Sequence, residues 1–345
     1  IDRGGVFASI AGTLMLLEPE ERARVKGVVI NKFRGDKTIL QPGLDMLEEI
    51  TKVPVVGVVP YLYLDLDEED GLSERFYHKQ EVGLVDIAVL RLPRLSNFTD
   101  FNALEYIPGV TLRYVKSVGE LKQPDLIILP GTKNTMADLL WLRQNGLEAA
   151  VLKHAAAGKP VFGICGGYQM LGMELSDPDG VEHGGTMRGL GLLPVKTIFT
   201  KEKVRTRVSG HFQNVSGVLQ GLTGVAMTGY EIHMGQTISN GEDTAPLTMI
   251  QQIQEQPCRQ QDGSQSGNIY GTYIHGVFDE EAVAKGVVSA LLREKGLDET
   301  AVQAVDLAAY KESQYDQLAD GVRNSLDMKK IYEILEQGMD AEDAK

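Results

Sequence analysis

Short hydrophobic runs alternate along the chain with segments of helical periodicity. In its first part they predict a helix at 6–17, a strand at 25–31, a helix at 40–50 and a strand at 53–59. Brief, nearly continuous apolar runs are typical of parallel strands covered on both faces. Strands that alternate with helices indicate a parallel sheet, so this part predicts an α/β unit of about 80 residues, the back half of a larger domain.

An acidic segment at 64–71 has no core pattern, and we expect it to be a solvated loop that connects two domains. The α/β alternation then restarts near Val82. A helix is predicted at 135–157, with Trp141 packed inward, and residues 186–251 are rich in β-branched residues, which favours antiparallel strands. Further strands are predicted at 85–90, 110–115, 125–129, 160–164 and 269–274.

The end of the chain predicts helices, because apolar residues recur there at helical spacing from Leu318 to Leu335. A length of 345 residues suits two domains or slightly more. We therefore divide the chain into a partial domain at 1–81, a second α/β domain at 82–290 and a helical extension at 291–345.

Composition removes several classes of function. The net charge of −14 argues against a nucleic-acid binder, which needs a basic face. No apolar run is long enough to predict a transmembrane helix. Two distant cysteines, Cys165 and Cys258, form neither a disulfide framework nor a zinc motif, so we expect a cytoplasmic protein without a metal site.

The strongest chemical signal is Cys165, which lies between a predicted buried strand and a predicted helix, with glycines at −2 and +2. This pattern is typical of a nucleophile elbow, a sharp strand-to-helix turn that exposes the nucleophile. A helix N-terminus favours the thiolate, and the N–H of Gly166 would face a developing oxyanion. A lone cysteine is usually a buried core residue. That interpretation holds for Cys258, whereas the glycine spacing favours catalysis at Cys165.

A nucleophilic cysteine needs a base, and two histidines compete for this role. His275 follows an apolar strand, and strand ends are where α/β enzymes place site residues. His233 is its rival, and spacing alone favours His275 only modestly. Gly131 follows the predicted strand 125–129 and could supply a second oxyanion-hole N–H, although most Pro-Gly pairs mark plain turns.

Several motifs together resemble a known family. Residues 163–169 (GICGGYQ) look like the nucleophile motif of class I glutamine amidotransferases. The whole chain resembles the adenosylcobyric acid synthase family, the glutamine-hydrolysing amidases of cobalamin biosynthesis. The segments that match this family, in order, are 1–7, 31–36, 97–100, 130–135, 163–172, 229–235 and 273–278.

The resemblance implies a flavodoxin-like glutamine amidotransferase domain that follows the C-terminal half of a P-loop domain similar to dethiobiotin synthetase. It implies Cys165 as nucleophile, His275 as general base, Gly131 and Gly166 at the oxyanion hole, and Gln169 at the glutamine pocket. The reaction that it implies uses ATP, Mg²⁺ and glutamine to amidate side-chain carboxylates of a cobyrinic acid a,c-diamide. Asp2 would lie near the phosphates and magnesium, and Asn31 near the purine.

Two features depart from the family pattern. No G-x-x-x-x-G-K-[ST] loop occurs, so we expect an N-terminally truncated chain that binds ATP weakly or not at all. Class I domains carry an acid two residues after the histidine, where this chain has Val277. The base therefore either lacks a third member or takes it from elsewhere. We expect a Cys–His dyad of low activity, with Glu280 and Glu281 facing solvent.

Two alternatives remain open at this point. The chain could be another amidotransferase of the same architecture, such as a cobyrinate a,c-diamide synthase or a cell-wall amidating enzyme. It could instead be a catalytically silent scaffold that uses the fold for binding.

Overall fold

The computed structural model describes residues 5–62, 64, 83–240, 244–299 and 307–342. They form two compact units, one within 1–66 together with 308–345 and one within 67–307. The C-terminal helices therefore group with the N-terminal unit and do not form an extension of the second one, which differs from the division expected from sequence. The expected boundary at 81/82 and nearly all of the acidic segment 64–71 lie outside the described residues.

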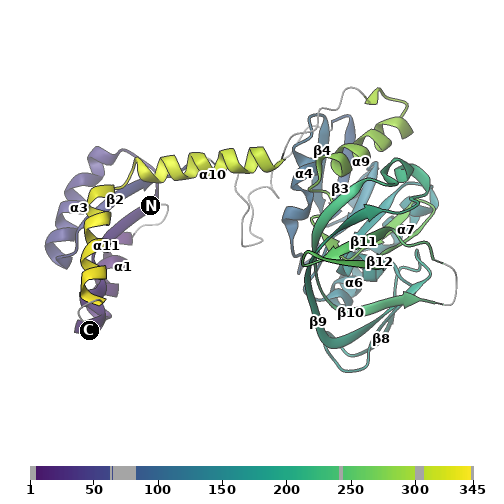
Figure 1. Cartoon of the computed structure of the whole chain (residues 1–345), viewed down its shortest axis with the longest axis horizontal. Coiled ribbons are helices and arrows are strands. Elements are labelled where there is room, and N and C mark those ends of the chain that lie inside the picture. The colour runs from purple at the N-terminus through teal and green to yellow at the C-terminus, as the bar shows by residue number, and fades with distance from the viewer. Residues whose placement is uncertain (1–4, 63, 65–82, 241–243, 300–306, 343–345) are drawn as a thin grey trace. The chain divides into compact units, whose positions relative to one another are not determined.

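The first unit is built on two parallel strands, which confirms the expected local α/β pattern. Ile30, Leu44 and Val58 form its small core. The C-terminal segment joins this unit through backbone bonds: Asp327 N donates to Val56 O at 2.8 Å, which brings α11 beside β2 (Figure 1). The elements are α1 (Val6–Leu16), α2 (Pro19–Arg24), β1 (Val28–Phe33), α3 (Lys37–Thr51), β2 (Val55–Pro60), α10 (Leu307–Arg323) and α11 (Met328–Glu342).

The second unit contains a six-stranded sheet in the order β13-β14-β6-β5-β3-β4. All neighbours pair in parallel except β13 with β14, and four of the strands are buried along their whole length, as the continuous apolar runs predict. The strands are β3 (Val85–Leu90), β4 (Val110–Val115), β5 (Leu126–Leu129), β6 (Val161–Ile164), β13 (Ser264–Ser266) and β14 (Ile269–Thr272).

The helix expected at 135–157 is two helices, which corrects the sequence prediction. Gly146 adopts φ 73° between them, a left-handed conformation that ends the first helix. Trp141 is partly buried against the core, as expected. The helical elements of this unit are η2 (Phe98–Phe101), α4 (Asn102–Glu105), α5 (Val118–Leu121), α6 (Thr135–Gln144), α7 (Leu147–Ala156), α8 (Gly166–Leu171), η3 (Gly217–Leu222) and α9 (Glu281–Glu294).

A second, mostly antiparallel sheet follows the order β12-β11-β9-β10-β15, with β7 paired to β9 and β8 paired to β7. The predicted strand 269–274 is divided between the two sheets, because the chain leaves β14 after Thr272 and pairs again with β10 at Ile274. His275 therefore lies where the two sheets meet. The strands are β7 (Glu174–Asp177), β8 (Gly185–Arg188), β9 (Val195–Phe212), β10 (Ala226–Ser239), β11 (Thr248–Ile253), β12 (Gln256–Asp262) and β15 (Ile274–His275).

Within the described ranges, no helix is long and apolar enough to cross a membrane. No cluster of three or more His, Cys, Asp or Glu side chains suited to a metal ion occurs in the same part of the chain.

Candidate active site

Cys165 occupies a strained turn between β6 and α8. Its backbone angles are φ 51° and ψ −109°, a region that non-glycine residues rarely adopt and that is common at functional sites. Cys165 as a whole is 7% exposed, and its Sγ lies 3.7 Å from the carbonyl oxygen of Ile232 on β10. The strand, turn and helix expected around Cys165 are all present.

Gly167 shows why the elbow needs glycine. A Cβ at this position would collide with the carbonyl oxygen of Leu129 at the end of the neighbouring strand β5. The first turn of α8 can thus pack directly on the sheet only with glycine at this position.

A third catalytic side chain, beside Cys165 and His275, bonds the His275 ring from a distant part of the sequence and not from the position of Val277. Nδ1 of His275 donates to Oδ2 of Asp100 at 2.7 Å, and both side chains are 1% exposed. The other oxygen of Asp100 accepts from the N–H of Gly276 at 3.0 Å. The imidazole is therefore held by a buried carboxylate from η2, which corrects the expectation of a dyad without one.

Charge around His275 favours the imidazolium. Burial lowers the pKa of the ring, but the charge and hydrogen bond of Asp100 and the interaction with Cys165 outweigh burial and raise this pKa to about 10. A cationic His275 stabilises a thiolate at Cys165, as the nucleophile requires.

Three further residues enclose the His275 ring. Tyr230 stacks against it, with centroids 5.3 Å apart and 21° between planes. Asn97, in the left-handed region with φ 54°, places its Nδ2 3.0 Å from Nδ1 and 3.1 Å from Nε2. A Cβ on Gly131 would lie 2.7 Å from Cε1 of the ring. The ring therefore has little room to move.

Gly131 and Gly166 lie on facing segments beside the thiol. A Cβ on Gly166 would be 2.7 Å from Cγ2 and 3.2 Å from N of Thr132, the residue that follows Gly131. The loop after β5 therefore abuts the start of α8. Both expected oxyanion-hole positions lie at this contact.

His233, the other candidate base, makes contacts that differ from those of His275. Its ring stacks on Tyr273, with centroids 3.8 Å apart, and its Nδ1 lies 3.2 Å from the carbonyl oxygen of Gly235. Burial lowers the pKa of His233 to about 4. None of the carboxylates in the described part of the chain bonds its ring, so His233 lacks the orienting group that His275 has.

A pocket of about 410 Å³ opens at the thiol. Gln169 lies in its wall, 2% exposed, with Oε1 accepting from Thr135 at 2.8 Å and Nε2 donating to Met234 O at 3.0 Å. Both ends of the Gln169 amide are therefore hydrogen-bonded within the protein, and the side chain forms part of the pocket wall. The lining residues are Ser96, Asn97, Thr132, Lys133, Thr135, Cys165, Gln169, Val181, Glu182, Lys203, Ile232, His233, Met234 and His275.

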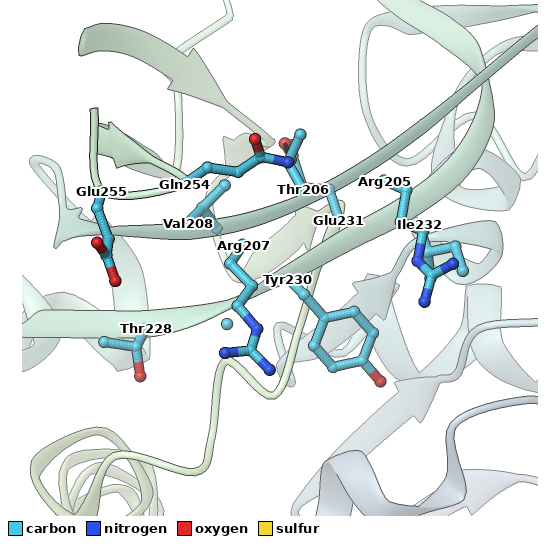
Figure 2. Close-up of a pocket in the computed structure, with 11 residues that line it drawn as sticks. Arg205, Thr206, Arg207, Val208, Thr228, Tyr230, Glu231, Ile232, Gln254 and Glu255 are labelled. Atoms are coloured by element: carbon cyan, nitrogen blue, oxygen red, sulfur yellow. Dashed lines mark hydrogen bonds between the residues drawn. The ribbon is translucent and has the colours of Figure 1, made fainter. Parts of the chain in front are cut away.

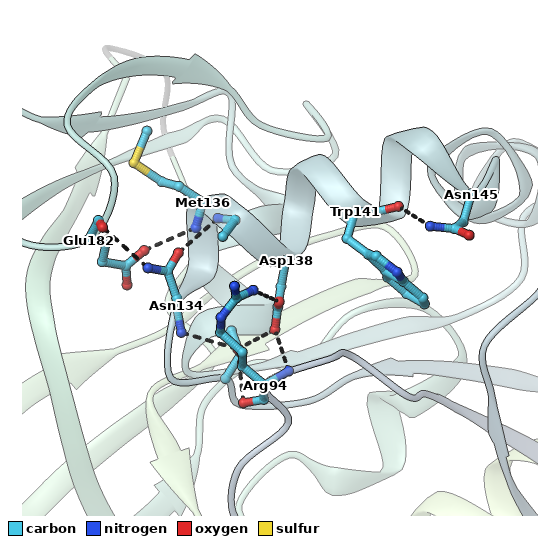
Figure 3. A network of polar contacts seen from close by, with 9 residues as sticks. Arg94, Asn134, Met136, Asp138, Trp141, Asn145 and Glu182 are labelled. Atoms are coloured by element: carbon cyan, nitrogen blue, oxygen red, sulfur yellow. Dashed lines mark hydrogen bonds and ion pairs between the residues drawn. The ribbon is translucent and has the colours of Figure 1, made fainter.

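Glu182 brings a carboxylate to this pocket. Its Oε2 accepts from the N–H of Met136 at 3.0 Å, at the start of α6, and its backbone oxygen accepts from Asn134 (Figure 3). Partial burial raises the pKa of Glu182, because the lost hydration outweighs these hydrogen bonds. The neighbouring segment is held by Asp177, whose carboxylate accepts backbone N–H groups from residues 181–184.

Asp138 fixes the loop that carries Gly131. This fully buried carboxylate on α6 accepts from the N–H of Arg94 at 3.1 Å and pairs with its guanidinium at 2.9 Å (Figure 3). It also accepts from the hydroxyl of Thr132. The loop geometry beside the thiol therefore depends on a buried polar network.

Of the other expected residues, Cys258, Glu280 and Glu281 do not line the thiol pocket. Cys258 is partly buried in β12, with its Sγ 3.8 Å from Ile250 O. Glu280 accepts from Thr228 at 2.7 Å, and Glu281 is exposed at the start of α9. Asn31 is exposed on β1, and Asp2 lies outside the described residues.

Sequence reasoning missed Asp100, Asn97 and Glu182. Residues 97–100 matched a family segment, but nothing local assigned them a role. The available signal was an acidic residue between two aromatic residues in the run Phe98–Phe101, where a buried, paired carboxylate is the expected explanation.

Comparisons with known proteins agree with this geometry. The sequence model of the CobB/CobQ-like glutamine amidotransferase domain matches residues 86–283. A cobyric acid synthase from Ruminiclostridium cellulolyticum is 57% identical over 99% of this chain and 66% of the relative. One from Lachnoclostridium phytofermentans is 52% identical, covering 98% and 68%, and one from Alkaliphilus metalliredigens is 46% identical, covering 97% and 68%.

The chain spans about two thirds of the length of these curated relatives. A solved structure of PurLQS from Thermotoga maritima aligns with 61% of the chain at 19% identity and a TM-score of 0.44, a similarity too low to support a conclusion. The sequence matches, together with the elbow and the buried His275, show that this chain belongs to the cobyric acid synthase family and carries its CobB/CobQ-like glutamine amidotransferase domain.

Proposed function

We propose that this chain hydrolyses glutamine at Cys165. The observation that carries the proposal is the buried arrangement of Cys165, His275 and Asp100 at one pocket. The thiolate attacks the carboxamide carbon, His275 donates its proton to the departing ammonia, and a thioester remains. Water then attacks the thioester, His275 takes up the proton, and glutamate and the thiolate are released.

Backbone N–H groups of Gly131 and Gly166 would stabilise the tetrahedral oxyanion. The close contact of their two segments supports this assignment, because both donors need to converge on one oxygen. Asp100 holds the imidazole with Nδ1–H toward itself, so that Nε2 is left for Cys165 and the substrate.

The pocket has charges suited to the amino-acid end of glutamine. Glu182 offers a carboxylate for the α-ammonium, and Lys133 and Lys203 offer cations for the α-carboxylate. Opposite charges at separate positions orient a zwitterion, so its carboxamide end would enter toward Cys165.

In the whole protein, we propose that the released ammonia amidates side-chain carboxylates of cobyrinic acid a,c-diamide in a cytoplasmic reaction. ATP with Mg²⁺ would supply the activation of each carboxylate when bound. We assign the first unit, with its parallel β1–β2 pair, to that ATP-dependent domain. Asn31 is exposed on β1, so a purine could reach it. The family relationship and the parallel strands support this part of the proposal.

A glutamine-like chloroketone is expected to alkylate Cys165 before Cys258. The elbow exposes Cys165 to the pocket, and the cationic His275 favours its reactive thiolate. Peptide mapping by mass spectrometry after limited labelling gives the site, and added glutamine should protect it. Labelling mainly at Cys258, or equal labelling in the presence of glutamine, would contradict a glutaminase and favour a catalytically silent scaffold.

Glu182→Gln is expected to raise KM for glutamine roughly tenfold or more with kcat little changed, as for loss of uniform substrate binding. Glutamine at this position keeps an acceptor for Met136 N–H but lacks the charge that attracts an ammonium. Steady-state ammonia release measures both constants. Glu174→Gln, an exposed position on β7, is the matched control. A fall in kcat with unchanged KM would exclude this role for Glu182.

A further inference from the structure

A second pocket, of about 930 Å³, lies beside the thiol pocket on strands β9 and β10. Arg205 and Arg207 project from one face of β9, directly opposite Ile232 and Tyr230 of β10. Figure 2 shows their guanidinium groups on either side of the Tyr230 ring. This volume is in the range of small-molecule sites.

The two arginines are available for a ligand. Both are exposed, and neither guanidinium has a hydrogen-bond or ion-pair partner among the described residues. They stand on a chain whose net charge is −14, so the local cationic character is not a general property of the surface. Two guanidinium groups on the same face of a strand, two residues apart, suit a ligand with more than one carboxylate.

Two carboxyl groups also line this pocket and affect its charge. Glu255 is exposed in the turn between β11 and β12. Glu231 is buried, and burial together with the charge of Asp262 raises its pKa to about 7. Near neutral pH much of Glu231 is therefore uncharged, and the two arginines outweigh Glu255.

Tyr230 connects the two pockets. This residue is 37% exposed, and its ring stacks on His275. The next residue but one, Ile232, lines both pockets, and its carbonyl oxygen contacts the thiol of Cys165. A ligand bound at Arg205 and Arg207 would therefore lie next to the place where ammonia is released.

We propose that this pocket binds the carboxylate-bearing acceptor, a corrinoid that still has several free side-chain carboxylates, through Arg205 and Arg207. This inference rests on the proposed function and adds the place on the chain where the acceptor is recognised. The guanidinium groups bind carboxylates that are not reacting, and Tyr230 provides an apolar surface for the ligand between them.

Binding of cobyrinic acid a,c-diamide to the full chain tests the proposal by equilibrium dialysis. Charge reversal of both arginines (Arg205→Glu with Arg207→Glu) is expected to weaken binding by about tenfold or more, since each removes a charge-assisted contact. The milder pair Arg205→Gln with Arg207→Gln should act in the same direction. The control Arg259→Glu with Lys285→Glu has the same change in net charge at exposed positions of β12 and α9, and should bind like the original chain.

A second arm uses the same corrinoid after its free carboxylates are converted to amides. This ligand should bind weakly to the original chain and should not respond to the arginine changes. An equal loss of affinity with the control pair, or an equal loss for both ligands, would overturn the proposal. Binding of an acidic protein at these arginines, with no binding of the corrinoid, would overturn it as well. Chloroketone labelling of Cys165 in the same variants separates this failure from a failure of the proposed glutaminase.

Discussion

Replacing His275 with alanine is expected to reduce glutamine hydrolysis by roughly 10³-fold or more, because proton transfer and thiolate stabilisation are lost together. The imidazole is the group that carries the Asp100 hydrogen bond and interacts with Cys165. Single-turnover assays of ammonia release would show loss of thioester formation itself. Alkylation of Cys165 near neutral pH should slow as well, since the thiolate loses its counter-ion.

His233→Ala is the matched control for this prediction. Its ring also lines the pocket but stacks on Tyr273 and bonds its own strand, so its removal should leave measurable turnover. If His233→Ala abolishes hydrolysis and His275→Ala retains it, the assignment of the base is wrong.

Asp100→Asn is expected to lower kcat by up to roughly 10⁴-fold, the loss found when the carboxylate that orients a catalytic histidine is replaced by an amide. The amide cannot hold the imidazolium and can favour the wrong tautomer. Steady-state ammonia release across pH should show that the remaining activity moves to higher pH, because fewer Cys165 thiolates form without the cationic partner.

Glu280→Gln and Glu281→Gln serve as controls for Asp100. Neither carboxylate bonds the imidazole, so each change should cost under about tenfold, or about 1.4 kcal/mol of barrier. A loss near 10³ at either position, with Asp100→Asn nearly active, would assign the orienting carboxylate to α9 or its start.

The same Asp100→Asn variant should show a pH-dependent loss of stability. The pKa of His275 is raised to about 10 from its ordinary 6.5, so its contribution to stability is fully present below pH 6.5 and disappears as the pH rises toward 10. The drop in thermal unfolding midpoint relative to the original chain should therefore be larger near pH 6 than near pH 9.5. An equal drop at both values would mean that Asp100 acts through packing alone.

The chemistry of the nucleophile can be recognised from the residues on either side of it. Glycines at −2 and +2 of Cys165, between an apolar run and a helical segment, can be recognised without any distant contact. The cause at Gly163 is local, since a Cβ there would lie 2.7 Å from the backbone N of Tyr168 in the same elbow, whereas a Cβ at Gly167 would meet the carbonyl oxygen of Leu129 on the neighbouring strand β5. The parallel strands β3 and β4 were predicted to the residue, and β3 is buried along its whole length, as expected for a strand covered on both faces.

The surroundings of His275, in contrast, depend on contacts between distant parts of the chain. Asp100 precedes His275 by 175 residues, and the two meet because η2 follows β3 in one sheet while β15 pairs with β10 in another. Glu182 is held at the thiol pocket by its bond to the start of α6. The register of β9 with β10 places Arg205 and Arg207 opposite Ile232 and Tyr230 in the second pocket. A residue pattern records which side chains are buried or exposed, but strand order and register determine which of them meet. The missing acid at Val277 could therefore be seen in the sequence, whereas its replacement could be found only in the fold.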